Sequence, residues 1–218
     1  GVLEKVIPEA FRFEKLPCLR DAGGTDKLVF SATPITDSLT SLKGSALSAT
    51  DGKQAVCVKM FKNVMGFMHD RKYTYPETLG RELLEACLLH PELRDELFLQ
   101  LVKQLHGNPK KESVYLGYAL LDMCLRSFPP SGVLENALEF FLRNQERWDL
   151  VRKLHRIVYK GAVCSVDDLP CESEIAEAHR SASAAATQPK AASKRWSKLR
   201  SWTQNSERIS KRQSVASI

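Results

Sequence analysis

Apolar residues recur at helical spacing through the middle of the chain, in six successive stretches. The first stretch places Phe61, Val64, Met65 and Met68 at positions i, i+3, i+4 and i+7, which is the pattern of one buried helix face. Proline, glycine and serine separate the stretches, as expected of short turns between helices. The expected helices cover residues 53–68, 77–89, 91–106, 113–128, 131–144 and 147–160.

Consecutive amphipathic helices joined by short turns can bury their apolar faces only against one another. The sequence therefore predicts an all-α protein, a compact helical bundle of about six helices. The segment before the bundle is expected to be irregular, because prolines and glycines such as Pro8, Pro17 and Pro34 interrupt its short apolar runs. The inward positions expected of the last helix are Trp148, Val151, Leu154, Ile157 and Val158.

The helical pattern ends near residue 163. Residues 164–177 carry five acidic and no basic side chains, and an Ala/Ser-rich stretch and a basic tail follow. These residues include too few large apolar side chains to offset the entropy of ordering them, so we expect 180–218 to be largely disordered when free. The expected domains are an N-terminal extension at 1–29, a helical module at 30–162, and an acidic, then Ser-rich and basic, linker or tail at 163–218.

The charge is distributed unevenly. The formal net charge of +6 resides in residues 194–212, which hold seven basic side chains and one acidic one. The rest of the chain is balanced, so nucleic-acid binding by a broadly basic body is not expected. The chain has six cysteines but no Cys-x-x-Cys pair, no long apolar run and no secretory signal. A reducing, cytoplasmic location is therefore expected.

Motifs of catalytic and metal sites do not occur in the sequence. The five histidines lack His-Glu-x-x-His spacing, and neither a Gly-rich phosphate loop nor a Gly-x-Ser-x-Gly elbow is present. We therefore expect a non-catalytic protein that uses no cofactor and no metal.

Four stretches carry a family resemblance. They are Pro-Ile-Thr-Asp-Ser-Leu at 34–39, the helix end at 61–70, Leu-Arg-Asp-Glu at 93–96 with the Lys-Gln that follows it, and the stretch at 113–131 that ends in Phe-Pro-Pro-Ser. In this order they resemble the myosin tail homology 4 domain of unconventional myosin tails, a plant kinesin and some Rho GTPase-activating proteins. The resemblance implies a cytoskeleton-associated interaction module of a motor tail or signalling scaffold, which binds microtubules or tubulin, or cargo proteins, beside a FERM domain outside these residues.

Basic side chains that could meet the acidic surface of a microtubule form three groups, at the end of the third helix, on one face of the first helix and along the last helix. The alternative for the lysines is an ordinary solvated face. For the last helix, the alternative is packing against the acidic 164–177 segment, which would neutralise the basic stripe. The candidate partner-binding residues are Lys59, Lys62, Lys103, Lys110, Lys111, Arg152, Lys153 and Arg156.

Charged residues open the third helix. We interpret Arg94, Asp95 and Glu96 as an ion-pair and capping network that holds neighbouring helices in register, with a binding edge as the alternative. The pair Pro129 and Pro130 ends the fourth helix. The remaining interpretation, a GTPase-activating domain with a catalytic arginine, would use Arg94 or Arg126.

The C-terminal tail interleaves bases with tryptophans, a pattern that suits an anionic membrane surface or a calmodulin-like groove. A membrane-adaptor module that acts through this tail is therefore the alternative function, and a flexible solubilising linker is the plain alternative for the tail itself. Ser197 and Ser214 follow basic residues, as in the sites of basophilic kinases. The candidate tail-binding residues are Lys194, Arg195, Trp196, Lys198, Arg200 and Trp202.

Overall fold

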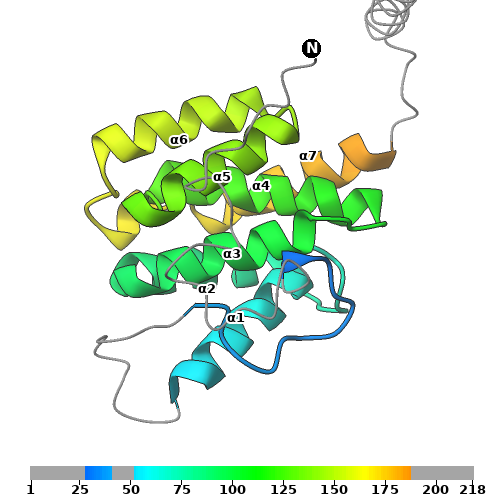
Figure 1. Ribbon diagram of the computed structural model, residues 1–218. Coiled ribbons are helices and arrows are strands. Elements are labelled where there is room, and N and C mark those ends of the chain that lie inside the picture. The colour runs from blue at the N-terminus through cyan, green and yellow to red at the C-terminus, as the bar shows by residue number, and fades with distance from the viewer. Residues whose placement is uncertain (1–27, 41–51, 188–218) are drawn as a thin grey trace, which may run out of the picture. The chain divides into compact units, whose positions relative to one another are not determined.

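The computed structural model of the chain describes residues 28–40 and 52–187, apart from the side chain of Lys53. Within these ranges the fold is all-α, as predicted, and Figure 1 shows its helices in chain order. The helices are α1 Gly52–Phe67, α2 Pro76–Leu89, α3 Arg94–Leu105, α4 Lys111–Ser127, α5 Gly132–Asn144, α6 Trp148–Lys160 and α7 Glu172–Thr187, with short 3-10 turns η5 Pro91–Leu93 and η6 Val166–Asp168.

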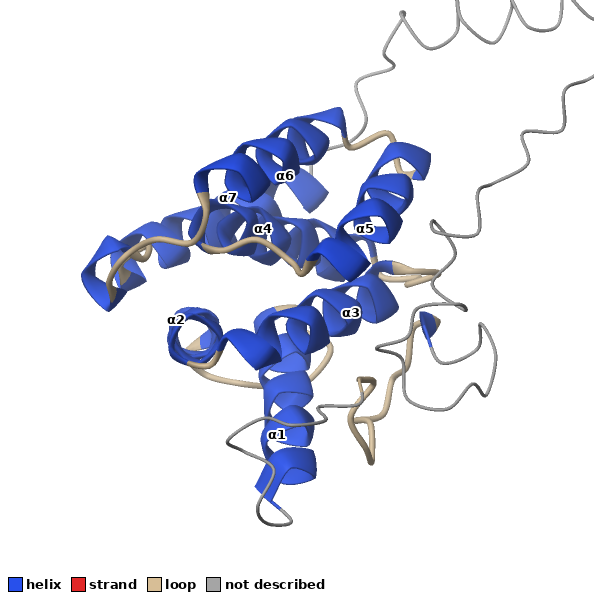
Figure 2. Ribbon diagram, turned by 60° about the vertical axis from the view of Figure 1, so that its left-hand side comes forward, coloured by secondary structure: helices blue, strands red, loops and turns tan. Residues whose placement is uncertain are grey.

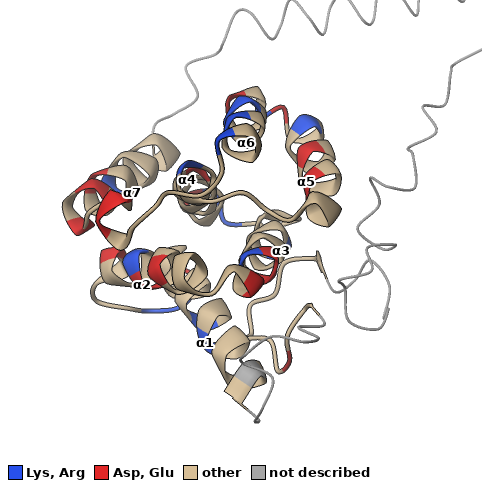
Figure 3. Cartoon of the chain, turned by 90° about the vertical axis from the view of Figure 1, so that its left-hand side faces the viewer, with Lys and Arg blue, Asp and Glu red and all other residues tan. Residues whose placement is uncertain are grey.

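The first six helices pack against one another around α3 and α4. Figure 3 shows α6 above α4 and α5, with α2 and α3 below these and α1 lowest. Figure 2 shows that α1 runs across the direction of α3 rather than along it. The turns are short, and Pro129 and Pro130 follow the end of α4 closely. This arrangement makes α3 and α4 the centre of the apolar core.

Helix α3 is buried along almost its whole length. Every residue from Glu96 to Leu105 is buried, including four polar side chains. The polar side chains lie on one side of the helix, because Lys103 and Gln104 are neighbours and the other positions are three, four, seven or eight apart. We call this group the α3 polar seam; it consists of Glu96, Gln100, Lys103 and Gln104.

The seam is covered by residues 28–40, which we call the N-terminal segment. The backbone N–H of Phe30 donates to the carbonyl of His106 (2.9 Å), and the His106 imidazole donates to the carbonyl of Leu28 (3.1 Å). Leu28 and Leu39 are buried in the core at either end of the segment. The irregular N-terminal residues that the structure describes are therefore part of the folded body.

Helix α6 is turned differently from the prediction. Its buried residues are Leu150, Val151, Leu154 and Ile157, whereas Trp148 is 50% exposed and Val158 is 36% exposed. The prediction that both of these side chains face inward was wrong. Leu150 completes the inward face instead, so Trp148, the first residue of the helix, lies at the surface, where the guanidinium of Arg143 stacks on its ring (5.2 Å to the ring centroid).

Helix α7 was not predicted, because the acidic and Ala/Ser-rich composition indicated a linker from residue 163. The structure contradicts that prediction for 163–187. The guanidinium of Arg81 on α2 holds the connection by donating to the carbonyls of Val166 (2.9 Å) and Pro170 (2.9 Å). Fully buried Ile175 then anchors α7 on the bundle, 3.0 Å from where a Cβ on Gly80 would lie. The remaining predicted tail, 188–218, lies outside the described residues.

Candidate functional site

Glu96 fixes the N-terminal segment to α3. Its Oε1 accepts hydrogen bonds from the backbone N–H of Leu39 (3.0 Å) and from Gln100 Nε2 (2.8 Å). Its Oε2 accepts them from the backbone N–H (2.8 Å) and hydroxyl (2.6 Å) of Thr40. A buried carboxyl group needs such partners to offset its desolvation. Glu96 is therefore engaged inside the fold and does not face a partner.

Arg94 and Asp95 also connect separate elements. Arg94 Nε donates to the carbonyl of Cys87 at the end of α2 (2.9 Å), and the guanidinium stacks on the ring of Phe128 (5.4 Å). Asp95 accepts hydrogen bonds from the backbone N–H (2.8 Å) and hydroxyl (2.5 Å) of Ser131, the residue that precedes α5. Three successive side chains thus hold α2, α5 and the N-terminal segment against α3. This placement disfavours a GTPase-activating role for Arg94.

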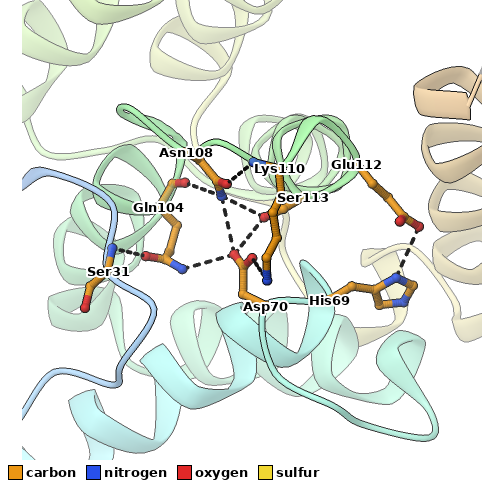
Figure 4. Close-up of polar contacts among 8 residues, drawn as sticks. All are labelled: Ser31, His69, Asp70, Gln104, Asn108, Lys110, Glu112 and Ser113. Atoms are coloured by element: carbon orange, nitrogen blue, oxygen red, sulfur yellow. Dashed lines mark hydrogen bonds and ion pairs between the residues drawn. The ribbon is translucent and has the colours of Figure 1, made fainter.

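A second polar cluster surrounds Asp70, just after α1, and Figure 4 shows its members converging from three elements. Asp70 Oδ2 accepts hydrogen bonds from the Ser113 hydroxyl (2.7 Å), Gln104 Nε2 (3.1 Å) and Asn108 Nδ2 (3.4 Å). Its Oδ1 faces Lys110 Nζ at 3.3 Å. The Asp70 side chain is fully buried, so this cluster sets how α1, α3 and α4 meet.

The predicted lysine cluster of Lys103, Lys110 and Lys111 is divided among internal contacts. Lys103 is buried and its Nζ donates to the carbonyl of Val29 (2.7 Å), and burial lowers the pKa of its ammonium. Lys111 Nζ donates to the carbonyl of Ala186 at the end of α7 (2.7 Å). The structure thus contradicts an exposed patch that includes Lys103. Sequence could not show this, because the acceptor carbonyls come from distant segments.

The two lysines on α1 are at the surface. Lys59 Nζ lies 3.7 Å from Glu82 Oε2, an exposed ion pair of the kind that contributes little to stability. Lys62 is exposed, and no residue in the described ranges forms an ion pair with it. Of these two lysines, Lys59 is thus partly neutralised and Lys62 is not.

Helix α6 presents a basic surface. Lys153 pairs with Asp122 on α4, and Arg147 pairs with Asp149 (2.9 Å). Arg152 and Arg156 are exposed, and no acidic side chain within 28–40 or 52–187 pairs with them. Being four residues apart, they share one side of the helix.

The acidic segment does not cover this stripe. Asp168 accepts hydrogen bonds from Ser165, Glu174 accepts one from the backbone N–H of Cys171, and Glu177 pairs with Arg180. These contacts are local to the segment that carries the acids. In the described residues, the acidic side chains of 164–177 therefore do not neutralise the basic stripe of α6.

A groove with a volume of about 590 Å³ lies between α4, the start of α6 and α7. The Arg147 guanidinium stacks on the ring of Tyr118 at its wall (4.1 Å). Burial raises the pKa of the Tyr118 phenol, so this group stays neutral at physiological pH. Sequence reasoning did not find this groove because its lining comes from three separate helices. The charged groups of its lining already have partners, since Arg147 pairs with Asp149 and Asp122 pairs with Lys153.

The tail residues singled out by sequence lie outside the described residues. These are Lys194, Arg195, Trp196, Ser197, Lys198, Arg200, Trp202 and Ser214. Over 28–40 and 52–187, no helix is long and apolar enough to cross a membrane. In the same ranges, no group of three or more His, Cys, Asp or Glu side chains could hold a metal ion.

Comparison with known proteins identifies the helical module. Residues 80–166 match the family model of the MyTH4 domain. This part of the chain belongs to the MyTH4 domain family. The MyTH4 domain is a non-catalytic interaction domain of myosin and kinesin tails, and this is the class of protein that the sequence predicts.

Relatives of the MyTH4 domain occur in motor proteins. The chain is 40% identical over 153 residues to the high molecular weight form of myosin-1 of Acanthamoeba castellanii, a match over 70% of this chain and 9% of that myosin. It is 30% identical over 128 residues to kinesin-like protein KIN-14E of Arabidopsis thaliana, over 55% of this chain and 10% of that kinesin. The chain therefore spans only a small part of each relative's length.

Solved structures share the fold. The human myosin 7b C-terminal MyTH4-FERM domain in complex with the harmonin-a PDZ3 domain aligns with a TM-score of 0.64 at 23% identity, over 75% of this chain and 34% of that one. The MyTH4-FERM MF1 domain of Dictyostelium discoideum myosin VII aligns with a TM-score of 0.59 at 18% identity, over 76% of this chain and 35% of that one. At these identities the likeness shows the fold alone.

Proposed function

We propose that this MyTH4 domain binds the acidic surface of microtubules through the outer face of α6, within the tail of a cytoskeletal motor or a signalling scaffold. The observation that carries the proposal is the exposed pair Arg152 and Arg156, which no acidic side chain of the described residues neutralises. Two such charges on one rigid helix attract an acidic surface and orient the contact, with a strength that depends on salt.

The surroundings of the pair support this role. Lys160 continues the row at the end of α6, so the three bases extend over about 12 Å at the rise of an α-helix. Tyr159 beside it is 96% exposed and offers a flat ring to a partner. The neighbouring carboxylate of Glu139 does not neutralise the pair, because it accepts hydrogen bonds from Arg143 and His155.

The other basic groups support the proposal less well. Lys103 and Lys111 donate to carbonyls of the protein itself, and Lys110 faces Asp70. Reversing their charges would disturb the fold together with any binding. The α6 pair can be reversed without breaking a contact among the described residues, so it gives the cleaner experiment.

Co-sedimentation with stabilised microtubules tests the proposal. In the full chain, Arg152→Glu with Arg156→Glu should weaken binding at least about tenfold, because two attractive surface charges become repulsive. The matched control is Arg71→Glu with Lys72→Glu, which makes the same charge change in the exposed turn between α1 and α2. Control and parent should pellet alike, and binding of the parent should decrease as salt increases.

The result that would remove this face from consideration is equal pelleting of the α6 variant and the control. Microtubules whose acidic tails have been removed by subtilisin give a second test from the side of the partner. The parent should bind these microtubules no more tightly than the α6 variant does. Circular dichroism confirms that both variants remain helical.

We further propose that the domain acts in the cytoplasm beside a FERM domain outside these residues and that it also contacts cargo proteins. Support comes from the solved human myosin 7b structure, in which a MyTH4-FERM domain is in complex with a PDZ domain of harmonin-a. Extending the chain through its following domain and repeating the pelleting assay would test this. If the added FERM domain left microtubule pelleting unchanged, the proposal that the two domains act together would be contradicted.

A further inference from the structure

We propose that Ser183 on α7 is a phosphorylation site and that its phosphorylation releases the C-terminal half of α7 from the bundle. This inference does not depend on microtubule binding. It rests on three observations: the contact that Ser183 makes with α4, the weak docking of the helix end that carries it, and the arginine that precedes it by one turn.

The Ser183 hydroxyl lies 2.6 Å from Glu112 Oε1 at the start of α4. This hydrogen bond, helped by the one from His69, holds the pKa of the Glu112 carboxyl below its ordinary value although partial burial acts in the opposite direction. At neutral pH the carboxylate can only accept, so the serine must donate. A phosphoserine has no proton on this oxygen and carries a charge of about −1.5 to −2. Phosphorylation therefore replaces a hydrogen bond by repulsion between two anions.

The helix end that carries Ser183 packs on the bundle through small apolar side chains. Between 180 and 187, the apolar side chains that pack inward are alanines, with Ala186 8% exposed and Ala182 partly buried. Lys111 adds one hydrogen bond to the Ala186 carbonyl (2.7 Å). The first half of α7 is better anchored, because Ile175 is fully buried and His179 Nε2–H donates to the carbonyl of Phe67 (2.9 Å). The C-terminal half can thus open locally while the rest stays docked.

Local opening makes the serine available to a kinase. Arg180 stands three residues before Ser183, the spacing at which many basophilic kinases require arginine. Its side chain is 71% exposed and, among the residues that the structure describes, pairs only with Glu177 on the same helix (2.7 Å). Ser181 lacks an arginine at this spacing. Of these two serines, Ser183 therefore fits both the recognition pattern and the contact across elements.

The charged groups around Ser183 decide whether a phosphate there would release α7 or fasten it. The nearest anion, Glu112, is in direct contact with the hydroxyl, and His69 Nδ1 lies 3.3 Å from the same carboxylate oxygen. The His179 ring lies against that of His69 (4.8 Å between centroids). The nearby cation, Lys111, is engaged by the Ala186 carbonyl and lies over the Tyr115 ring. Contact repulsion therefore outweighs attraction to a cation that has other partners.

The chemical step is an ordinary phosphoryl transfer from ATP with Mg²⁺. Ser183 Oγ forms a bond to the γ-phosphorus as the bond from that phosphorus to the β-phosphate oxygen breaks. ADP leaves, and the hydroxyl proton passes through the kinase to solvent. The full chain would be incubated with a basophilic kinase that requires arginine at this spacing, in a Ser197→Ala, Ser214→Ala background. Mass spectrometry should then locate the phosphate on Ser183.

Hydrogen exchange measures the release. Phosphorylated chain, or Ser183→Asp, should exchange the backbone amides between 180 and 187 about ten- to a hundredfold faster, as the loss of a charge-assisted hydrogen bond implies. Ser181→Asp is the matched control, because its hydroxyl contacts Glu177 within α7 rather than α4. It should change exchange by less than about threefold. Glu112→Gln combined with Ser183→Asp should restore slow exchange, because an amide can donate to the new anion.

Three results would overturn the proposal. One is phosphorylation of a peptide covering 176–187 while the full chain stays unmodified, since the helix would then not open enough. Another is slower exchange after phosphorylation, which would mean that Lys111 captures the phosphate and fastens the helix. The third is equal exchange in the Ser183→Asp chain with and without Glu112→Gln, since the contact with α4 would then not be the cause.

Discussion

Replacing Glu96 with alanine should detach the N-terminal segment and destabilise the fold by about 3–5 kcal/mol. The substitution removes the acceptor of four hydrogen bonds, two of them from the backbone N–H groups of Leu39 and Thr40. It also leaves a cavity at a position that is 0% exposed. The effect should therefore be both local, at the segment, and global.

The magnitude follows from the number and kind of bonds. Hydrogen bonds to a charged group contribute about 1.5–3 kcal/mol each, so four of them sum to roughly 6–12 kcal/mol. The sum overstates the loss, because Leu39 and Thr40 regain bonds to water once the segment lifts off. Buried charged networks broken at one partner typically cost about 3–5 kcal/mol, and we take this as the expected range. Glu96→Gln should cost less, about 1–3 kcal/mol, because its amide oxygen still accepts.

Urea unfolding followed by circular dichroism measures the global effect, and hydrogen exchange at Leu39 and Thr40 measures the local one. Glu82→Ala is the control, because this glutamate on α2 contacts only the exposed side chains of Lys59 and Asn63 within the described part of the chain. It should change stability by less than about 1 kcal/mol. A loss below about 1 kcal/mol for Glu96→Ala, with Leu39 and Thr40 still protected, would refute the role assigned to Glu96.

Two further predictions concern the packing of α4 and α7. Gly117→Ala should destabilise the fold by about 1–3 kcal/mol in urea unfolding, because its Cβ would lie 2.6 Å from Met68 Cε and 2.9 Å from Leu105 Cδ2. Gly132→Ala, which meets nothing within 4 Å, should be neutral or slightly stabilising, and equal effects of the two would contradict the packing. Burial lowers the pKa of His179 below its ordinary 6.5. The imidazole therefore binds a proton more readily in the unfolded chain than in the folded one. As pH falls from 7 through 6.5 and below, the docking of α7 should weaken. His179→Gln keeps a donor to the Phe67 carbonyl, and exchange of the α7 amides in it should lose this pH dependence; an unchanged dependence would contradict the assignment.

The first six helices were predictable because each buries a continuous apolar stripe. The predicted 77–89, 131–144 and 147–160 differ from α2, α5 and α6 by one residue at the start. Helix α7 lacks such a stripe, since Ile175 is its only large buried aliphatic side chain. Its order comes from contacts with Phe67, Gly80 and Glu112, which local sequence does not reveal.

The binding surface was only partly predictable for a related reason. Arg152 and Arg156 could be placed together because a helix fixes the relation of residues four apart. Lys103 could not be separated from the exposed lysines, because its position on α3 fits an exposed helix end as well as a buried one. Its buried place depends on the Val29 carbonyl, which the N-terminal segment brings from 74 residues away. Charge along a helix thus predicts a shared side but not what covers that side.

The N-terminal segment also sets the boundaries of any recombinant fragment. The family model matches 80–166, and a fragment cut to that match would lack both this segment and α1. In such a fragment, α3 would expose side chains that are buried in the intact protein, namely Glu96, Lys103 and Gln104. A recombinant fragment should therefore begin no later than Leu28 and run to Thr187. The polar seam then stays covered and α7 stays packed on the bundle.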